Sequence, residues 1–503
     1  METIGGAPSA PTRSRWKTRV LLGLLALGLA GAPAHADAPQ APADTFAAGQ
    51  VIASVASRAD TTNRYALYLP RRYDTGRRWP VLLVLDPRGR ALHAMERFAD
   101  AAERDGYVVM SSYNTVSDST EEPNRRALNA MLADAEQRFA GDPGRIYLAG
   151  FSGTARLAWL YASVLSGHVK GILGFAAGLP WRGLDAYVAL KKAPPFAFFG
   201  GAGMLDFNYD EVRLLDAMLD SLTHQPHRLE YFVGPHGWPP EAICGDAIDW
   251  MELQAVKDSA VLRNDSLISI WYTRRLDAAK RLEMSGDMYE AWRRYQATQE
   301  DFRGVRGIEE ATTKVAALSS LPIVRQSSAR EDDLGKSLDE YRTGVLRSFV
   351  SDFQAAKQPP PLARALKDLR IADLQRHAAD STRDRLAALE AQRALILVRV
   401  TTGYYEPRAY QARGDFTRAL AMLAVAHALD PADPDVCYEI AEAEASTGRV
   451  SEAIESLRCA AARGGLTADV VRGDHAFDAI RGIPAFASLV QSLAIGDHAG
   501  PTP

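Results

Sequence analysis

The chain has 503 residues, 47% of them hydrophobic and 24% charged, and its formal net charge is −4. Two or more domains are expected, because one ordinary hydrophobic core rarely extends over so long a chain. The composition is that of a folded globular protein, and the charge argues against a basic surface for nucleic acid and against an acidic tail.

The first 36 residues predict an export signal rather than part of the fold. Basic residues between Arg13 and Arg19 precede the apolar run VLLGLLALGLAGAPA, and the small-residue sequence AHA ends at Ala36. The run is shorter than the roughly 20 apolar residues of a membrane span, so cleavage is favoured over an uncleaved anchor. Residues 37–49 are rich in Pro and Ala and predict a disordered leader. We therefore expect a periplasmic or secreted chain with no stable membrane span.

Residues 50–258 alternate between strand and helix patterns. Continuous apolar runs such as VLLVL and FAFF are typical of strands that are buried on both faces. The predicted strands are 51–57, 64–69, 80–85, 107–111, 145–149, 171–175, 196–199 and 228–233. The predicted helices are 92–104, 123–139, 155–165 and 210–222. Such alternation predicts an α/β domain with a mainly parallel sheet and helices on both faces.

The fifth predicted strand runs into Gly150-Phe151-Ser152-Gly153-Thr154. This pattern is typical of a nucleophile elbow, in which a serine sits on a strained turn between a strand and a helix. The usual pattern, G-x-S-x-G, has glycine where Thr154 stands, and a β-branched residue is bulkier at a crowded position. The alternative is a serine that simply caps a helix.

A reactive serine needs a base and an acid that orients the base. Asp206 follows the seventh predicted strand and is favoured as the acid over Asp210, which is more typical of the first turn of a helix. His236 follows the last predicted strand, and Gly237 lets its loop turn tightly. The chain order Ser, Asp, His is the one expected on this type of sheet.

The oxyanion hole should combine the N–H of Gly153 with a second N–H from the loop after the third strand. That loop reads LDPRGRAL, and because proline has no N–H, Arg88 or Gly89 must supply the donor. An ordinary turn is the alternative. Trp238 and Asn114 are candidate substrate contacts, although a solvated loop is the alternative for Asn114.

From residue 262 onward the strand pattern disappears and helix formers dominate. Near the end a spacing of 34 residues relates Gly414 to Gly448 and Ala419 to Ala453, which resembles the tetratricopeptide repeat. The interval from glycine to alanine recurs at Gly286, so another unit is expected at 270–303. We predict a helical region over 262–400 and tetratricopeptide-like repeats with terminal helices over 401–495. A plain helical bundle is the alternative.

Residues 50–256 resemble the α/β-hydrolase superfamily, and most closely secreted esterases of the polyhydroxybutyrate-depolymerase and feruloyl-esterase type. The resemblance is carried by YALYLPRRYDTGRRWPVLLVLDPRGR and DPGRIYLAGFSGTAR. It implies hydrolysis of a small-molecule or polymer ester through an acyl-enzyme, with Ser152 as nucleophile, His236 as base and Asp206 as the orienting acid. No cofactor or metal is expected, because no motif has metal-ligand spacing and no phosphate loop is present.

Three cysteines remain for interpretation. Cys244 is expected to be a small buried residue, whereas Cys437 and Cys459 can form a disulfide in an exported chain. The helical repeats predict a protein partner or a docking site for substrate. An alternative from a different class is an exported interaction protein whose hydrolase domain is catalytically degenerate.

Overall fold

The computed structural model describes residues 46–117, 121–165, 167–181, 183–192, 196–221, 225–380, 385–462 and 466–496. The predicted signal peptide, and the predicted leader up to residue 45, lie outside this set. Residues 47–503 form one compact unit. The N–H of Gly49 donates to the carbonyl of Leu69 at 2.7 Å, so regular hydrogen bonding begins inside the predicted leader.

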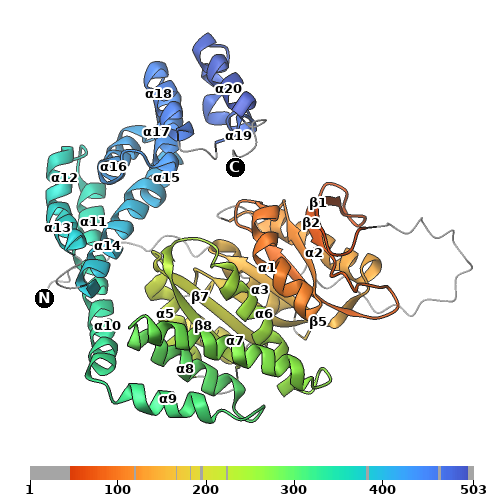
Figure 1. Ribbon diagram of the computed structural model, residues 1–503. Coiled ribbons are helices and arrows are strands. Elements are labelled where there is room, and N and C mark those ends of the chain that lie inside the picture. The colour runs from red at the N-terminus through yellow and green to blue at the C-terminus, as the bar shows by residue number, and fades with distance from the viewer. Residues whose placement is uncertain are drawn as a thin grey trace, which may run out of the picture. The chain divides into compact units, whose positions relative to one another are not determined.

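The centre of this unit is an eight-stranded sheet with the order β1-β2-β4-β3-β5-β6-β7-β8 (Figure 1). The strands are β1 (Val51–Ala56), β2 (Arg64–Tyr68), β3 (Trp79–Leu85), β4 (Val108–Ser112), β5 (Gly141–Phe151), β6 (Val169–Phe175), β7 (Ala197–Leu205) and β8 (His227–Pro235). The β1–β2 and β2–β4 pairs are antiparallel, and every other pair is parallel. This is the sheet of an α/β-hydrolase fold, as the sequence predicts.

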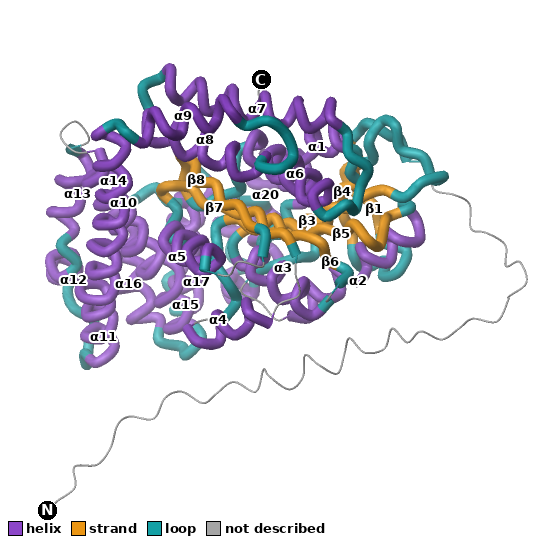
Figure 2. Tube along the Cα trace, turned by 90° about the horizontal axis from the view of Figure 1, so that it is seen from below, coloured by secondary structure: helices purple, strands orange, loops and turns teal. Residues whose placement is uncertain are grey.

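Helices cover both faces of the sheet. Figure 2 shows α1 (Ala91–Asp105) and α6 (Glu241–Lys257) on one face, and α2 (Glu121–Arg138), α3 (Gly153–Val164) and α5 (Tyr209–Asp220) on the other. The sequence pattern predicts four of these helices but not α6. All residues of α6 from Ile243 to Ala255 are buried, and they include the acidic residues Asp246, Asp249 and Glu252. The buried face therefore does not coincide with an apolar stripe in the sequence. The sequence pattern also does not predict α4 (Gly183–Lys192).

The seventh strand is longer than predicted. It continues through the glycine-rich stretch up to Leu205, where the sequence suggested a loop after residue 199. A side chain on Gly201 would lie 2.0 Å from the carbonyl oxygen of Glu230 on β8. These glycines therefore allow close approach of neighbouring strands rather than a turn.

Beyond α6 the described chain is helical. Its α-helices are α7 (Asp265–Met284), α8 (Met288–Phe302), α9 (Glu309–Ser319), α10 (Pro322–Glu340), α11 (Arg347–Ala355), α12 (Leu362–Asp368), α13 (Ile371–Ala379), α14 (Arg385–Val400), α15 (Glu406–Gln411), α16 (Phe416–Leu429), α17 (Pro434–Ser446), α18 (Val450–Ala461), α19 (Ala468–Gly473) and α20 (Pro484–Gly496). Two π-helical segments (Tyr341–Leu346 and Thr401–Tyr405) and one 3-10 helix (His475–Ile480) complete the region. None of the helices in the described ranges is long and apolar enough to cross a bilayer.

The repeat glycines end helices as their spacing suggests. Gly286, Gly414 and Gly448 have φ values of 86°, 74° and 74°, a left-handed conformation that glycine adopts without strain. Each follows one helix and precedes the next, at α7–α8, α15–α16 and α17–α18. The alanines at the repeat positions, Ala419 and Ala453, are fully buried, which lets the paired helices approach closely.

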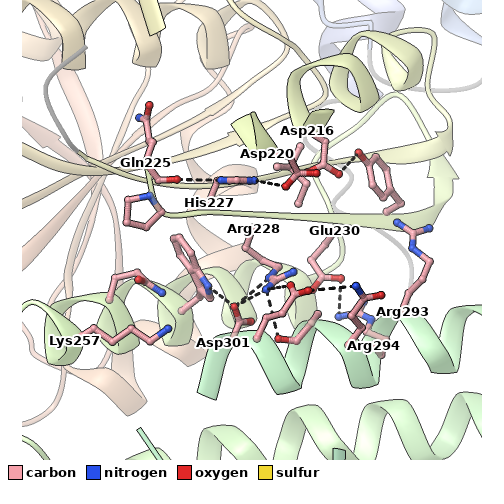
Figure 3. Close-up of a pocket in the computed structure, with 18 of the residues that line it drawn as sticks. Asp216, Asp220, Gln225, His227, Arg228, Glu230, Lys257, Arg293, Arg294 and Asp301 are labelled. Atoms are coloured by element: carbon pink, nitrogen blue, oxygen red, sulfur yellow. Dashed lines mark hydrogen bonds and ion pairs between the residues drawn. The ribbon is translucent and has the colours of Figure 1, made fainter. Parts of the chain in front are cut away.

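A buried ionic network joins the edge strand β8 to the first helices of this region. Asp301 of α8 is 3% exposed and accepts a hydrogen bond from Arg228 of β8 (Figure 3). It also accepts hydrogen bonds from Arg275 of α7 and from the indole of Trp250 on α6. A polar cavity of about 510 Å³ lies between β8 and α8 beside this network. The helices therefore cover the edge of the sheet.

Candidate active site

Ser152 occupies the sharp corner between β5 and α3. Its φ is 55° and its ψ is −128°, a conformation that is costly for a residue with a side chain. A side chain on Gly150 would lie 2.5 Å from the carbonyl oxygen of Thr154, so strand and helix crowd each other here. The N–H of Ser152 donates to the carbonyl of Phe175 on β6 at 2.9 Å. These constraints place the serine at the carboxyl edge of the sheet.

Thr154 fits the elbow because its hydroxyl bonds to the backbone around it. The side chain is fully buried, and Oγ1 lies 2.5 Å from the carbonyl oxygen of Leu85 at the end of β3. The same oxygen lies 2.8 Å from the carbonyl of Phe151 and accepts the N–H of Phe151 at 3.1 Å. Thr154 thus connects the end of β3 to the strained turn.

The structure brings the three predicted triad residues together in one hydrogen-bonded line. His236 Nε2 lies 3.0 Å from Ser152 Oγ, and His236 Nδ1 lies 2.9 Å from both carboxylate oxygens of Asp206. An ionised carboxylate only accepts, so Nδ1 carries the proton and Nε2 is left to accept from the serine hydroxyl. This is the geometry of a serine nucleophile with its general base.

The acid and the base are both held by their surroundings. Asp206 is 2% exposed and accepts the N–H of Asn208 at 2.7 Å, while the Asn208 side chain donates to the carbonyl of Ala176 at 2.8 Å. The rings of Phe151 and Phe207 flank His236, with centroids 4.7 and 4.1 Å from the imidazole. These contacts fix the direction in which the imidazole points.

Asp210, the alternative acid, lies in the first turn of α5. Burial raises the pKa of its carboxyl, and this effect outweighs the nearby charges of Arg393, Arg342 and Arg213. The hydrogen bonds to the imidazole come from Asp206 instead.

The loop after β3 does not present the free N–H group that the predicted oxyanion hole requires. The N–H of Gly153 has no acceptor among the described residues and lies at the start of α3, as an oxyanion donor should. The N–H of Arg88, however, donates to the Asp86 carboxylate at 2.8 Å, and the N–H of Gly89 donates to the Asp86 carbonyl at 3.2 Å. Both predicted second donors are therefore occupied, and the loop adopts the ordinary turn that was the alternative.

Asp86 organises this loop, and the sequence interpretation did not single it out. Its carboxylate is fully buried and accepts from the backbone of Arg88 and Arg90 and from the indole of Trp238. Burial alone would raise the pKa of Asp86, but these hydrogen bonds and the charge of Arg90 lower it overall. An acid directly after a buried strand and before a proline is the signal that could have identified it.

The two residues predicted to contact substrate make hydrogen bonds within the fold instead. Trp238 is 8% exposed, donates to Asp86 at 2.8 Å and packs against Phe151, so it belongs to the core rather than to a pocket wall. Asn114 accepts the N–H of Arg64 at 2.8 Å. The amide of Asn114 therefore fixes the start of β2.

Sequence spacing also missed one group of metal-ligand type. Asp216, Asp220 and His227 lie close together between α5 and the start of β8. Figure 3 shows His227 between Asp220 and the backbone carbonyl of Gln225, at 3.1 and 3.0 Å. Because His236 follows the other end of β8, this group is separate from the triad.

Cys437 of α17 and Cys459 of α18 are joined in a disulfide, with the sulfur atoms 1.98 Å apart. Cys244 is buried, and burial raises the pKa of its thiol.

Comparison with known proteins finds one family model and a set of similar solved structures. A family model described as tetratricopeptide repeat matches residues 410–463, the stretch that contains α16, α17 and α18. No curated protein matches. Similar solved structures include an S-formylglutathione hydrolase from Staphylococcus aureus, with 16% identity, 40% of this chain and 96% of that chain covered, and a TM-score of 0.33. Est1E from Butyrivibrio proteoclasticus has 11% identity and a TM-score of 0.32, and the match covers 41% of this chain and 100% of Est1E. A feruloyl esterase module from Clostridium thermocellum has 11% identity and a TM-score of 0.32, and the match covers 39% of this chain and 84% of that module's chain.

Proposed function

We propose that the chain is an exported serine hydrolase, and specifically a carboxylic ester hydrolase that works through an acyl-enzyme. The observation that carries the proposal is the line of hydrogen bonds from Ser152 through His236 to Asp206, with the serine on a strained turn. A helix-capping serine needs neither the imidazole at 3.0 Å nor a buried carboxylate behind it.

The proposed reaction uses each group in turn. Ser152 Oγ attacks the acyl carbonyl while His236 Nε2 takes the hydroxyl proton, and Asp206 stabilises the imidazolium that forms. The tetrahedral intermediate collapses as His236 returns the proton to the leaving alcohol, which leaves an ester between the acyl group and Ser152. Water then attacks this ester with His236 as base, and the carboxylic acid and the free serine are released.

The N–H of Gly153 is the proposed donor to the developing oxyanion. A second donor would require the loop after β3 to exchange one partner, so that the N–H of Arg88 leaves the Asp86 carboxylate and meets the substrate oxygen. Because loss of one such donor typically lowers turnover by roughly 10²–10³, a loop that keeps its bonds to Asp86 would leave turnover lower by about that factor.

Export and docking complete the proposal. The disulfide between Cys437 and Cys459 supports an oxidising compartment, in agreement with the predicted signal peptide. The tetratricopeptide repeat match supports a role of the helices in binding a protein partner or in docking substrate.

One observation favours the alternative of an interaction protein with a degenerate hydrolase domain. The N–H groups of Arg88 and Gly89 are both bonded to Asp86, which leaves one free backbone donor in the expected hole. This alternative predicts a folded protein whose serine does not react.

A fluorophosphonate probe separates the two proposals. The hydrolase proposal expects labelling of the full chain, its loss in Ser152→Ala, and hydrolysis of p-nitrophenyl esters that falls by about 10⁶ in the same variant. Ser163→Ala is a matched control, because the Ser163 hydroxyl bonds only to the carbonyl of Trp159 within α3. Folded wild-type protein that is not labelled would favour the alternative.

A further inference from the structure

The loop that carries Asp206 is held from two directions. Within the α/β part, the N–H of Asp206 donates to the carbonyl of Gly203, and the N–H of Tyr209 donates to the carbonyl of Asp206, both at 3.0 Å. The carbonyl of Met204 instead accepts from Nε of Arg393 at 2.7 Å. Arg393 belongs to α14, in the helical region, so a distant part of the chain reaches a residue two positions before the acid.

The same guanidinium also meets the other side of the loop. Its central carbon lies 3.8 Å from the centroid of the Tyr209 ring, three residues after Asp206. Arg393 is only 4% exposed, and a buried charge is costly unless polar and aromatic partners replace its water. Besides the nearby carboxyl of Asp210, those partners are a carbonyl and a ring on the two flanks of the acid loop. Arrangement of the loop and burial of the arginine therefore depend on each other.

A second helix holds Tyr209 from its hydroxyl end. Glu331 of α10 accepts from the hydroxyl of Tyr209 at 2.5 Å, from Arg213 at 2.8 Å and from the hydroxyl of Tyr289 at 2.8 Å. Burial opposes ionisation of this carboxyl, but the charges of Arg213 and Arg293 outweigh it and lower its pKa to about 2. The acceptor therefore stays charged near neutral pH, and Tyr209 is fixed both at its face and at its hydroxyl.

We infer that Arg393 is a positioning residue for the catalytic acid, and that the helical region completes the active site as well as offering a docking surface. The inference rests on the proposed function, since it assigns the arginine a role in orienting Asp206 behind His236. A displacement of about 1 Å in a catalytic group can cost roughly 10² in rate, so a loop that is held in part by one buried side chain is sensitive to its loss.

The test compares Arg393→Met, which removes the charge and the donor, with Arg393→Lys, which keeps the charge. Both are made in the full chain and measured with p-nitrophenyl butyrate across pH. We expect kcat to fall by 10- to 100-fold in Arg393→Met with KM within about 2-fold, and the acidic limb of kcat/KM to move to lower pH. Arg393→Lys should recover part of kcat. The shift in pH is expected because a displaced carboxylate stabilises the imidazolium less.

Arg399→Met is the matched control, because Arg399 lies on the same helix but pairs with Asp433 before α17. It should leave kcat and the pH profile unchanged. The inference is overturned if folded Arg393→Met or, where that variant does not fold, Arg393→Lys has wild-type kcat and an unshifted profile. A wild-type chain that the fluorophosphonate does not label would instead refute the proposed function on which the inference rests.

Discussion

Replacing Thr154 by glycine restores the usual pattern of the elbow, and we expect this change to damage the protein. The hydroxyl of Thr154 bonds to Leu85 and Phe151 in a fully buried site, at 2.5 to 3.1 Å. A buried backbone group left without a partner costs about 1–3 kcal/mol, and glycine in a helix costs only about 0.3 kcal/mol more than threonine. With two backbone groups affected, Thr154→Gly should lose about 2–6 kcal/mol.

Thermal unfolding followed by tryptophan fluorescence, together with ester turnover, measures the effect. Stability should fall in the order wild type, Thr154→Ser, Thr154→Val, Thr154→Gly, because serine keeps the hydroxyl and valine keeps only the volume. Thr313→Gly, at an exposed helical position of α9, reports the propensity cost together with the loss of one exposed hydroxyl bond to the carbonyl of Glu309. A Thr154→Gly variant that melts with wild type or turns over faster would refute the assigned role of the hydroxyl.

Three further predictions concern contacts that connect different secondary-structure elements. Asp301→Asn should destabilise the protein by about 3–5 kcal/mol, because the buried Arg275 and the partly buried Arg228 lose their carboxylate. Asp435→Asn, at an exposed pair with Arg88, should cost under about 1 kcal/mol in the same melting experiment. The pKa of Glu331 drops from 4.5 to about 2 on folding, so ionisation of this carboxyl contributes about 3 kcal/mol to the stability of the folded state. This contribution is complete above pH 4.5 and is lost as the pH falls towards 2. The melting temperature of Glu331→Gln should therefore depend less on pH over this range than that of the wild type. The disulfide joins two cysteines that are 22 positions apart, and its reduction should lower the free energy of unfolding by about 3 kcal/mol. In the double variant Cys437→Ser, Cys459→Ser, the melting temperature should not change when reductant is added.

The parts of the fold that the sequence predicts well are those with strong local patterns. Continuous apolar runs mark β3 and the start of β7, and the repeat glycines mark the turns between paired helices. The chain order of Ser152, Asp206 and His236 is sufficient to predict that these three side chains meet, because parallel strands bring their carboxyl ends to one edge of the sheet.

The remaining features depend on contacts that have no local pattern. Helix α6 is buried all round, and Gly201 faces a neighbouring strand, so neither follows the expected periodicity. The oxyanion loop was misjudged because a buried carboxylate, Asp86, takes the N–H of Arg88 and the indole of Trp238. The role assigned to Arg393 depends on contact between residues 189 positions apart, which a single sequence does not reveal.

The most direct test of the central claim is to locate a covalent adduct. Full-length protein is treated with a fluorophosphonate and digested, and the modified peptide is sequenced by mass spectrometry. The account predicts a single adduct on Ser152, formed at least 10²-fold more slowly in His236→Ala. Folded protein with no adduct, or with an adduct that persists at the wild-type rate without His236, would contradict it.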